Sequence, residues 1–170
     1  MALHLVPDDI AALAARVVAE NAAQGRKVAV AESCTGGLVA GAITEIAGSS
    51  AVLDRGFVTY SNEAKMEMLG VASDIIETFG TDSIACAWSM ARGALDRSKA
   101  DVAVAISGVA GPGGGTALKP VGTVVFARVV RNADGEPEGE LKLFEGGEGP
   151  DGRAIIRRQA TLCALELLLP

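Results

Sequence analysis

The chain has 170 residues, of which 49% are hydrophobic and 21% are charged, and its formal net charge is −6 at pH 7. This length and apolar content predict one globular domain, residues 1–170, with a sizeable core. The acidic balance argues against binding to nucleic acid or to an anionic membrane surface, since both need a basic face. No run of about 18 apolar residues exists, so we expect no membrane span.

Helical and strand patterns alternate along the chain. Helices are expected where apolar residues recur at helical spacing behind a capping residue or a proline, in residues 7–25, 37–46, 61–69, 73–80, 83–99 and 153–169. Strands are expected where short apolar runs lie between turn residues, in residues 27–31, 56–60, 101–106, 121–130 and 141–144. Ser61 or Asn62, Ser73 and Ser83 are the expected helix caps.

This order of elements predicts the fold class. Strands that alternate with helices indicate a three-layer α/β/α sandwich around a mostly parallel mixed sheet. Residues 101–106 are apolar on both strand faces, which is typical of a central strand covered on both sides. The hairpin over residues 121–144 places at least one strand antiparallel. Trp88 and the alanine-rich helix around it could pack against a second subunit, which leaves a homo-oligomer open.

Cysteine and histidine usage limits the kinds of site. Cys34, Cys86 and Cys163 are odd in number and widely spaced, which indicates reduced thiols in a cytoplasmic protein. They lack metal-ligand spacing, and His4 is the only histidine, so we expect no metal site. A site built on a Ser-His-Asp or Cys-His arrangement would have to recruit His4 from an N-terminus, where chains usually fray.

The turn around Ser33 is the first candidate for chemistry. An apolar strand runs into Glu32-Ser33-Cys34-Thr35-Gly36-Gly37, and a helix is expected to follow. Such a turn sets a hydroxyl opposite backbone N–H groups, as acyl-transfer chemistry requires. Ser33 could instead be an ordinary helix N-cap. Cys34 is either a small buried hydrophobe or a thiol nucleophile activated by the same helix end.

A serine nucleophile needs a base, and Lys65 is the best placed. It lies about one turn into the helix that follows the strand ending at Tyr60. A desolvated lysine can be neutral near pH 7 and then accept a proton. Tyr60 could orient the lysine or pass a proton. The simpler alternatives are a solvated surface lysine and a half-buried packing tyrosine.

A glycine-rich loop over residues 107–116 follows the central strand. Consecutive glycines let main-chain N–H groups converge on an anion. The loop matches neither the Walker A spacing nor a full G-x-G-x-x-G, so a plain structural turn is an equal alternative. Thr116 and Lys119 add a donor and a positive charge.

Three arginines cluster on the terminal helix of this acidic protein. Arg153 and Arg157 are spaced i, i+4 and could hold one phosphate together, with Arg158 beside them. The alternative is ordinary surface pairing with acids such as Glu148 and Asp151.

Taken together, these segments resemble the CinA C-terminal domain family in its stand-alone form, the nicotinamide-nucleotide amidases. The resemblance spans nearly the whole chain in order. The matching blocks are residues 31–37 (AESCTGG), 47–50 (AGSS), 56–65 (GFVTYSNEAK), 69–71 (LGV), 106–114 (ISGVAGPGG), 119–124 (KPVGTV) and 157–160 (RRQA).

The resemblance implies hydrolysis of the carboxamide of nicotinamide mononucleotide to nicotinic acid mononucleotide and ammonia, by a serine-lysine mechanism without a metal or other cofactor. By motif, Ser33 is the expected nucleophile, Lys65 its base, and Tyr60 and Ser107 the supporting hydroxyls. We expect the amides of Gly36 and Gly37 to hold the oxyanion. The expected substrate-binding residues are Thr35, Gly36, Gly37, Gly108, Gly111, Gly113, Arg153 and Arg157. A non-catalytic nucleotide- or phosphate-binding module of the same fold is the alternative.

One position departs from the family pattern. The family commonly reads Gly-Ala-Val-Ser before the long helix, whereas this chain has Gly80-Thr81-Asp82-Ser83. Ser83 remains to cap the helix, so we expect a local change and retained activity. If Asp82 lines the pocket, its charge would repel a phosphate and alter the choice of substrate.

Overall fold

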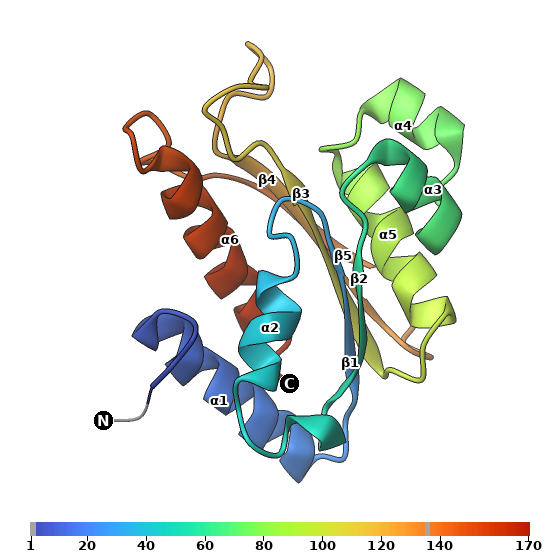
Figure 1. Ribbon diagram of the computed structural model, residues 1–170. Coiled ribbons are helices and arrows are strands. Elements are labelled where there is room, and N and C mark those ends of the chain that lie inside the picture. The colour runs from blue at the N-terminus through green and yellow to red at the C-terminus, as the bar shows by residue number, and fades with distance from the viewer. Residues whose placement is uncertain (1–2, 135–136) are drawn as a thin grey trace.

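The computed structural model describes residues 3–134 and 137–170 (Figure 1). One mixed sheet runs in the order β2-β1-β3-β4-β5. Its strands are β1 (Val28–Glu32), β2 (Leu53–Val58), β3 (Val102–Gly108), β4 (Thr123–Val130) and β5 (Glu138–Leu143). β1 is parallel to both β2 and β3, and β4 is antiparallel to both β3 and β5. All strands except β4 therefore point the same way, which confirms the predicted α/β class with a mixed sheet.

Helices cover both faces of this sheet in three layers. One face carries α1 (Asp8–Ala23), α2 (Leu38–Thr44) and α6 (Gly152–Leu167), and the other carries α3 (Asn62–Leu69), α4 (Ser73–Phe79) and α5 (Ile84–Asp96), as Figure 1 shows. A short 3-10 helix, η1 (Ser49–Ala51), leads into β2. In the described residues no helix is long and apolar enough to cross a bilayer.

The two cores differ in side-chain size because strand residues alternate between faces. Toward α1, α2 and α6 the central strands present large aliphatic side chains, namely Val28, Val30, Val102, Val104 and Ile106. Toward α5, β1 and β3 present only alanines, namely Ala29, Ala31, Ala103 and Ala105, whereas β4 presents Val125, Ala127 and Val129. The small face lets α5 approach the sheet closely.

Several element ends differ from the sequence prediction. β2 begins at Leu53 and ends at Val58, so the predicted strand over residues 56–60 was placed too late. β5 begins at Glu138, three residues before the predicted start. Both are edge strands of the sheet, and their partly exposed, polar residues hide the apolar pattern.

The predicted caps are confirmed at two helices and wrong at a third. Ser61 Oγ accepts a hydrogen bond from the Ala64 amide, and Ser83 Oγ accepts one from the Cys86 amide. Ser73 is the first residue of α4 and does not cap it; the preceding residue holds the N-cap position without a side-chain bond.

Trp88 is half-buried and packs against the core beside α5. A Cβ added to Gly139 of β5 would come within 2.4 Å of Trp88 Nε1, so the indole lies directly against that strand.

Candidate active site

The carboxyl ends of β1, β2 and β3 meet at one edge of the sheet. The chain passes from β1 to β2 on one side and returns to β3 on the other, so this edge is a topological switch point, where open α/β sheets bind ligands. Ser33 directly follows β1, and Tyr60 follows β2 by two residues. A cavity of about 150 Å³ lies there, lined by Ser33, Cys34, Tyr60, Asn62, Lys65, Thr81, Asp82, Gly108, Ala110 and Arg153.

Ser33 and Lys65 meet in this cavity. Lys65 Nζ lies 3.1 Å from Ser33 Oγ and donates a hydrogen bond of 3.0 Å to the carbonyl oxygen of Tyr60. Lys65 is 1% exposed and Ser33 6%. The position of α3 explains this contact, because Ser61 caps the helix at the end of β2 and the first turn then carries Lys65 inward. The alternative of a solvated surface lysine is therefore wrong.

Burial affects the pKa of the lysine. The described residues give Lys65 no carboxylate within ion-pair distance, and desolvation lowers the pKa of its amine below the usual 10.5. Nearby Cys86 and Asp82 oppose that shift only in part. A lysine with a lowered pKa has more of its neutral form at neutral pH, and the neutral form is the one that can act as a base.

Glu32 builds the turn that presents Ser33. Its fully buried carboxylate accepts hydrogen bonds from Thr35 Oγ1 at 2.6 Å and from the amides of Gly37, Val39 and Ala40 at 3.2, 3.0 and 3.1 Å. The carboxylate therefore provides acceptors for amide groups at the start of α2, which have no partner within the helix, and its negative charge interacts favourably with the helix dipole. The sequence analysis assigned Glu32 no role, although an acid just before a helix start was the available signal.

This network changes the expected oxyanion donors. The Gly37 amide donates to Glu32, and the Gly36 amide donates to the carbonyl oxygen of Ser33. Because both are already bonded, the expectation that they hold an oxyanion is not supported. In the described part of the chain the amide of Cys34, the residue after Ser33, has no acceptor. Thr35, Gly36 and Gly37 do not line the cavity and serve the turn itself.

The thiol of Cys34 is buried and has a raised pKa. Burial raises its pKa to about 12, with a smaller contribution in the same direction from the carboxylate of Asp82. A thiol with this pKa holds its proton at neutral pH, and the thiolate is the reactive form. The buried-hydrophobe interpretation of Cys34 is thus favoured.

The two candidate arginines have different positions. Arg157 Nε donates to the carbonyl oxygen of Cys34 at 3.0 Å, and its Nη2 lies 3.5 Å from that of Thr35, so this side chain braces the Ser33 turn. Arg153 lines the cavity, where it donates to Tyr60 Oη at 3.1 Å and to the Gly111 carbonyl at 2.7 Å. The two do not form the predicted phosphate clamp; only Arg153 faces the cavity. Arg158 pairs with Asp9 at 2.9 Å.

Ser107 reaches the cavity through another residue. It is buried at the end of β3, and its hydroxyl donates to Asp82 Oδ1 at 2.9 Å. Asp82, the position that departs from the family pattern, lines the cavity itself, next to Thr81.

The glycines of the loop over residues 107–116 differ in how they contribute to the cavity. Gly108 lines the cavity, and a Cβ there would lie 2.6 Å from the Thr123 carbonyl, so only glycine fits against β4. Gly111 offers its carbonyl to Arg153. Gly113 has no neighbouring atom within 4 Å of an added Cβ and does not line the cavity. Lys119 Nζ donates to the Phe79 carbonyl and holds the loop against α4.

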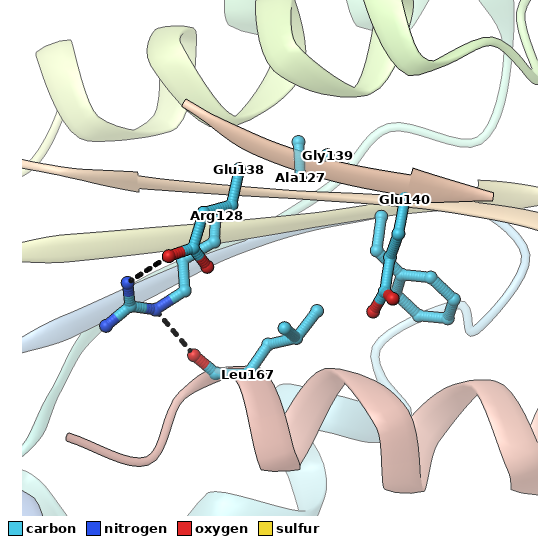
Figure 2. Close-up of a pocket in the computed structure, with 7 residues that line it drawn as sticks. Ala127, Arg128, Glu138, Gly139, Glu140 and Leu167 are labelled. Carbon is cyan, nitrogen blue, oxygen red and sulfur yellow. Dashed lines mark hydrogen bonds and ion pairs between the residues drawn. The ribbon is translucent and has the colours of Figure 1, made fainter. Parts of the chain in front are cut away.

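A second cavity of about 160 Å³ lies between β4, β5 and the end of α6 (Figure 2). Arg128 lines this cavity, but its guanidinium already donates to the Leu167 carbonyl at 2.9 Å and lies 3.7 Å from the carboxylate of Glu138. The lining residues include the carboxylates of Glu138 and Glu140 but no serine, threonine, cysteine or lysine.

Two further kinds of site residue considered in the sequence analysis are a histidine and a metal-binding cluster. His4 lies 3.4 Å from Glu45, which follows the C-terminal end of α2, whereas Ser33 precedes that helix. Within residues 3–134 and 137–170 no group of three or more His, Cys, Asp or Glu side chains is arranged to hold a metal ion.

Comparisons with known proteins identify the family of this chain. The family model of the CinA C-terminal domain matches residues 10–170. Over 146 residues the chain is 51% identical to the nicotinamide-nucleotide amidohydrolase PncC of Escherichia coli K12, covering 86% of this chain and 84% of that protein. It is 48% identical over 159 residues to a CinA-like protein of Akkermansia muciniphila, covering 94% of this chain but only 37% of that longer protein.

The solved structures include the competence/damage inducible protein CihA from Agrobacterium tumefaciens, which is 51% identical with a TM-score of 0.88 over 99% of this chain and 97% of that one. A CinA superfamily protein from Klebsiella pneumoniae is 38% identical with a TM-score of 0.84 over 94% of each chain. The chain therefore belongs to the CinA C-terminal domain family.

Proposed function

We propose that this protein is an amidase that hydrolyses the carboxamide of nicotinamide mononucleotide to nicotinic acid mononucleotide and ammonia. The relative from Escherichia coli that is named a nicotinamide-nucleotide amidohydrolase shares 51% of its aligned residues with this chain. The observation that carries the proposal is the buried amine of Lys65, 3.1 Å from the hydroxyl of Ser33. This distance lies within the hydrogen-bond reach that a general base requires.

In the acylation half, neutral Lys65 accepts the proton of Ser33 Oγ while that oxygen attacks the carboxamide carbon. The Tyr60 carbonyl, which accepts a hydrogen bond from Nζ, holds the amine in position. The tetrahedral intermediate then breaks its C–N bond, and the protonated lysine gives its proton to the departing nitrogen. Ammonia leaves and an acyl ester remains on Ser33.

In the deacylation half, water takes the place of ammonia. Lys65 accepts a proton from the water as its oxygen attacks the ester carbon. The bond from carbon to Ser33 Oγ then breaks, and the lysine returns the proton to that oxygen. The products are nicotinic acid mononucleotide and the original enzyme, so atoms and protons balance over the cycle.

The negative charge of each tetrahedral intermediate needs a donor, and we assign the backbone amide of Cys34 to this role. The amide of the residue after the nucleophile is the usual donor at such strand-to-helix turns. Arg157 supports the assignment, because its bond to the Cys34 carbonyl fixes the orientation of the neighbouring peptide. Loss of one such donor typically costs about 3 kcal/mol of activation free energy.

Substrate binding is assigned to the rim of the cavity. Arg153 is the arginine that lines the cavity. Its guanidinium N–H groups, which now contact Tyr60 and Gly111, can bind the phosphate of the substrate. Residues 1–170 would act as one domain. The described cysteines are unpaired, which suits a reducing cytoplasm.

Ammonia release from nicotinamide mononucleotide tests the proposal. Wild type should release ammonia, and Ser33→Ala should release none while its circular dichroism spectrum is unchanged. Ser73→Ala, which removes an exposed hydroxyl at the start of α4, is the matched control and should keep the wild-type rate. Binding of the nucleotide to wild type without ammonia release would favour the alternative of a non-catalytic binding module.

A further inference from the structure

The cavity contains a carboxylate that the proposed mechanism does not use. Asp82 is the only acid among the described residues that line it. The hydrogen bond from Ser107 at 2.9 Å occupies one carboxylate oxygen and fixes the side chain. No described lysine or arginine lies within ion-pair distance of it. A negative charge is therefore held at the cavity wall without a paired cation.

Neither of the two cationic residues that line the cavity, Lys65 and Arg153, forms an ion pair with Asp82. Desolvation lowers the pKa of Lys65, and a neutral amine is what its role as base requires. The guanidinium of Arg153 is directed to Tyr60 and Gly111. A carboxylate without a paired cation attracts a positively charged group of a bound ligand. The arrangement thus favours a ligand that brings a positive charge.

The two charged walls lie on opposite sides of the sheet. Asp82 comes from the segment between α4 and α5, and Arg153 comes from α6, which covers the other face (Figure 1). A ligand that spans the cavity meets a carboxylate toward α4 and α5 and a guanidinium toward α6. Nicotinamide mononucleotide has the complementary charges, since its ring nitrogen is a fixed cation and its phosphate is an anion.

We infer that Asp82 is a specificity residue that recognises the cationic pyridinium ring, so that the site selects carboxamides on an N-substituted pyridinium over those on an uncharged ring. The inference rests on the proposed function, because the carboxamide must reach Ser33 for the ring to lie beside Asp82. Ser107 is then a positioning residue that orients the carboxylate. In this arrangement the carboxylate of Asp82 does not repel the phosphate, because the phosphate binds to Arg153 instead.

The test compares two ligands that differ in ring charge: nicotinamide mononucleotide and its 1,4-dihydro form, whose ring is neutral. Calorimetry on the inert Ser33→Ala protein measures both dissociation constants without turnover. We expect the cationic form to bind at least about fivefold more tightly, a factor that corresponds to about 1 kcal/mol. Adding Asp82→Asn should bring the ratio close to one, because asparagine keeps an oxygen for the Ser107 hydroxyl but removes the charge.

Two further variants complete the test, one as a second substitution of Asp82 and one as a control. Asp82→Val should lose the preference in the same way, which covers a failure of Asp82→Asn to fold. Asp74→Asn removes an exposed acid from α4 and should keep the full preference. An unchanged ratio in a folded Asp82 variant would overturn the inference while leaving ammonia release by wild type, and hence the proposed function, intact. If wild type neither bound nicotinamide mononucleotide nor released ammonia from it, both the inference and the proposed function would be overturned.

Discussion

Lys65 Nζ and Ser33 Oγ lie 3.1 Å apart, although the two residues are 32 positions apart in the sequence and follow different strands. Parallel pairing of β1 with β2 brings them together, because it places both carboxyl ends at one sheet edge. The pair is buried, and desolvation lowers the pKa of the lysine.

Replacing Lys65 by methionine should abolish ammonia release and stabilise the protein. Methionine fills a similar volume without a charge to desolvate, so we expect the free energy of unfolding to rise by about 1 kcal/mol at neutral pH. Chemical denaturation alongside the ammonia assay measures both effects. Lys99→Met, at an exposed position after α5, should change neither quantity much. A Lys65→Met protein with wild-type turnover would remove lysine from the mechanism.

The pH dependence of kcat/KM should report the lysine. Because the neutral amine is the base, kcat/KM should rise with pH through the lowered pKa of Lys65 and level off above it. The unfolded chain, with its lysine pKa near 10.5, binds more protons than the folded one. The stability advantage of Lys65→Met should therefore be full below the folded pKa and shrink as pH rises toward 10.5. A rate profile without this ascending limb would contradict the assignment.

Glu32→Gln should destabilise the protein and lower kcat. The glutamine side chain can satisfy only part of the group formed by Thr35 Oγ1 and the α2 amides, at a cost of about 1–3 kcal/mol. The Ser33 turn then loses its internal support, so we expect kcat to fall more than KM rises. Thermal unfolding and steady-state kinetics measure these effects. Glu63→Gln, an exposed acid in the first turn of α3, is the control and should lower neither Tm nor kcat appreciably.

Substitutions of Arg153 and Arg157 should affect different kinetic parameters. Arg153→Ala should raise KM for nicotinamide mononucleotide about tenfold, as the loss of a charge-assisted phosphate contact would. Its KM for nicotinamide riboside, which lacks the phosphate, should not change. Arg157→Ala should instead lower kcat for both compounds, because it releases the carbonyls of Cys34 and Thr35. If Arg153→Ala weakened both compounds equally, the phosphate would have another partner.

The buried parts of the fold were predictable from the sequence. β1 and β3 read as strands because they are apolar on both faces, and Lys65 could be placed because Ser61 marks the helix start after β2. The edge strands β2 and β5 were misplaced, since solvent exposure on one side permits polar residues.

The site's polar contacts were not predictable from the sequence. The bond between Ser107 and Asp82 joins positions 25 apart on different elements, and Arg157 reaches Cys34 across 123 positions. No local pattern encodes such pairs, because they depend on how helices from both faces of the sheet meet at its edge. The same limit explains why Gly36 and Gly37 were expected to bind an oxyanion: their bonds to Ser33 and Glu32 appear only once the turn is folded.

The most direct test of the central claim is mass spectrometry after rapid acid quench of wild-type protein mixed with nicotinamide mononucleotide. The account predicts a transient acyl ester on the peptide that contains Ser33, absent from Ser33→Ala and Lys65→Met and retained in Cys34→Ala. An adduct on Cys34, or full turnover by Ser33→Ala, would contradict it.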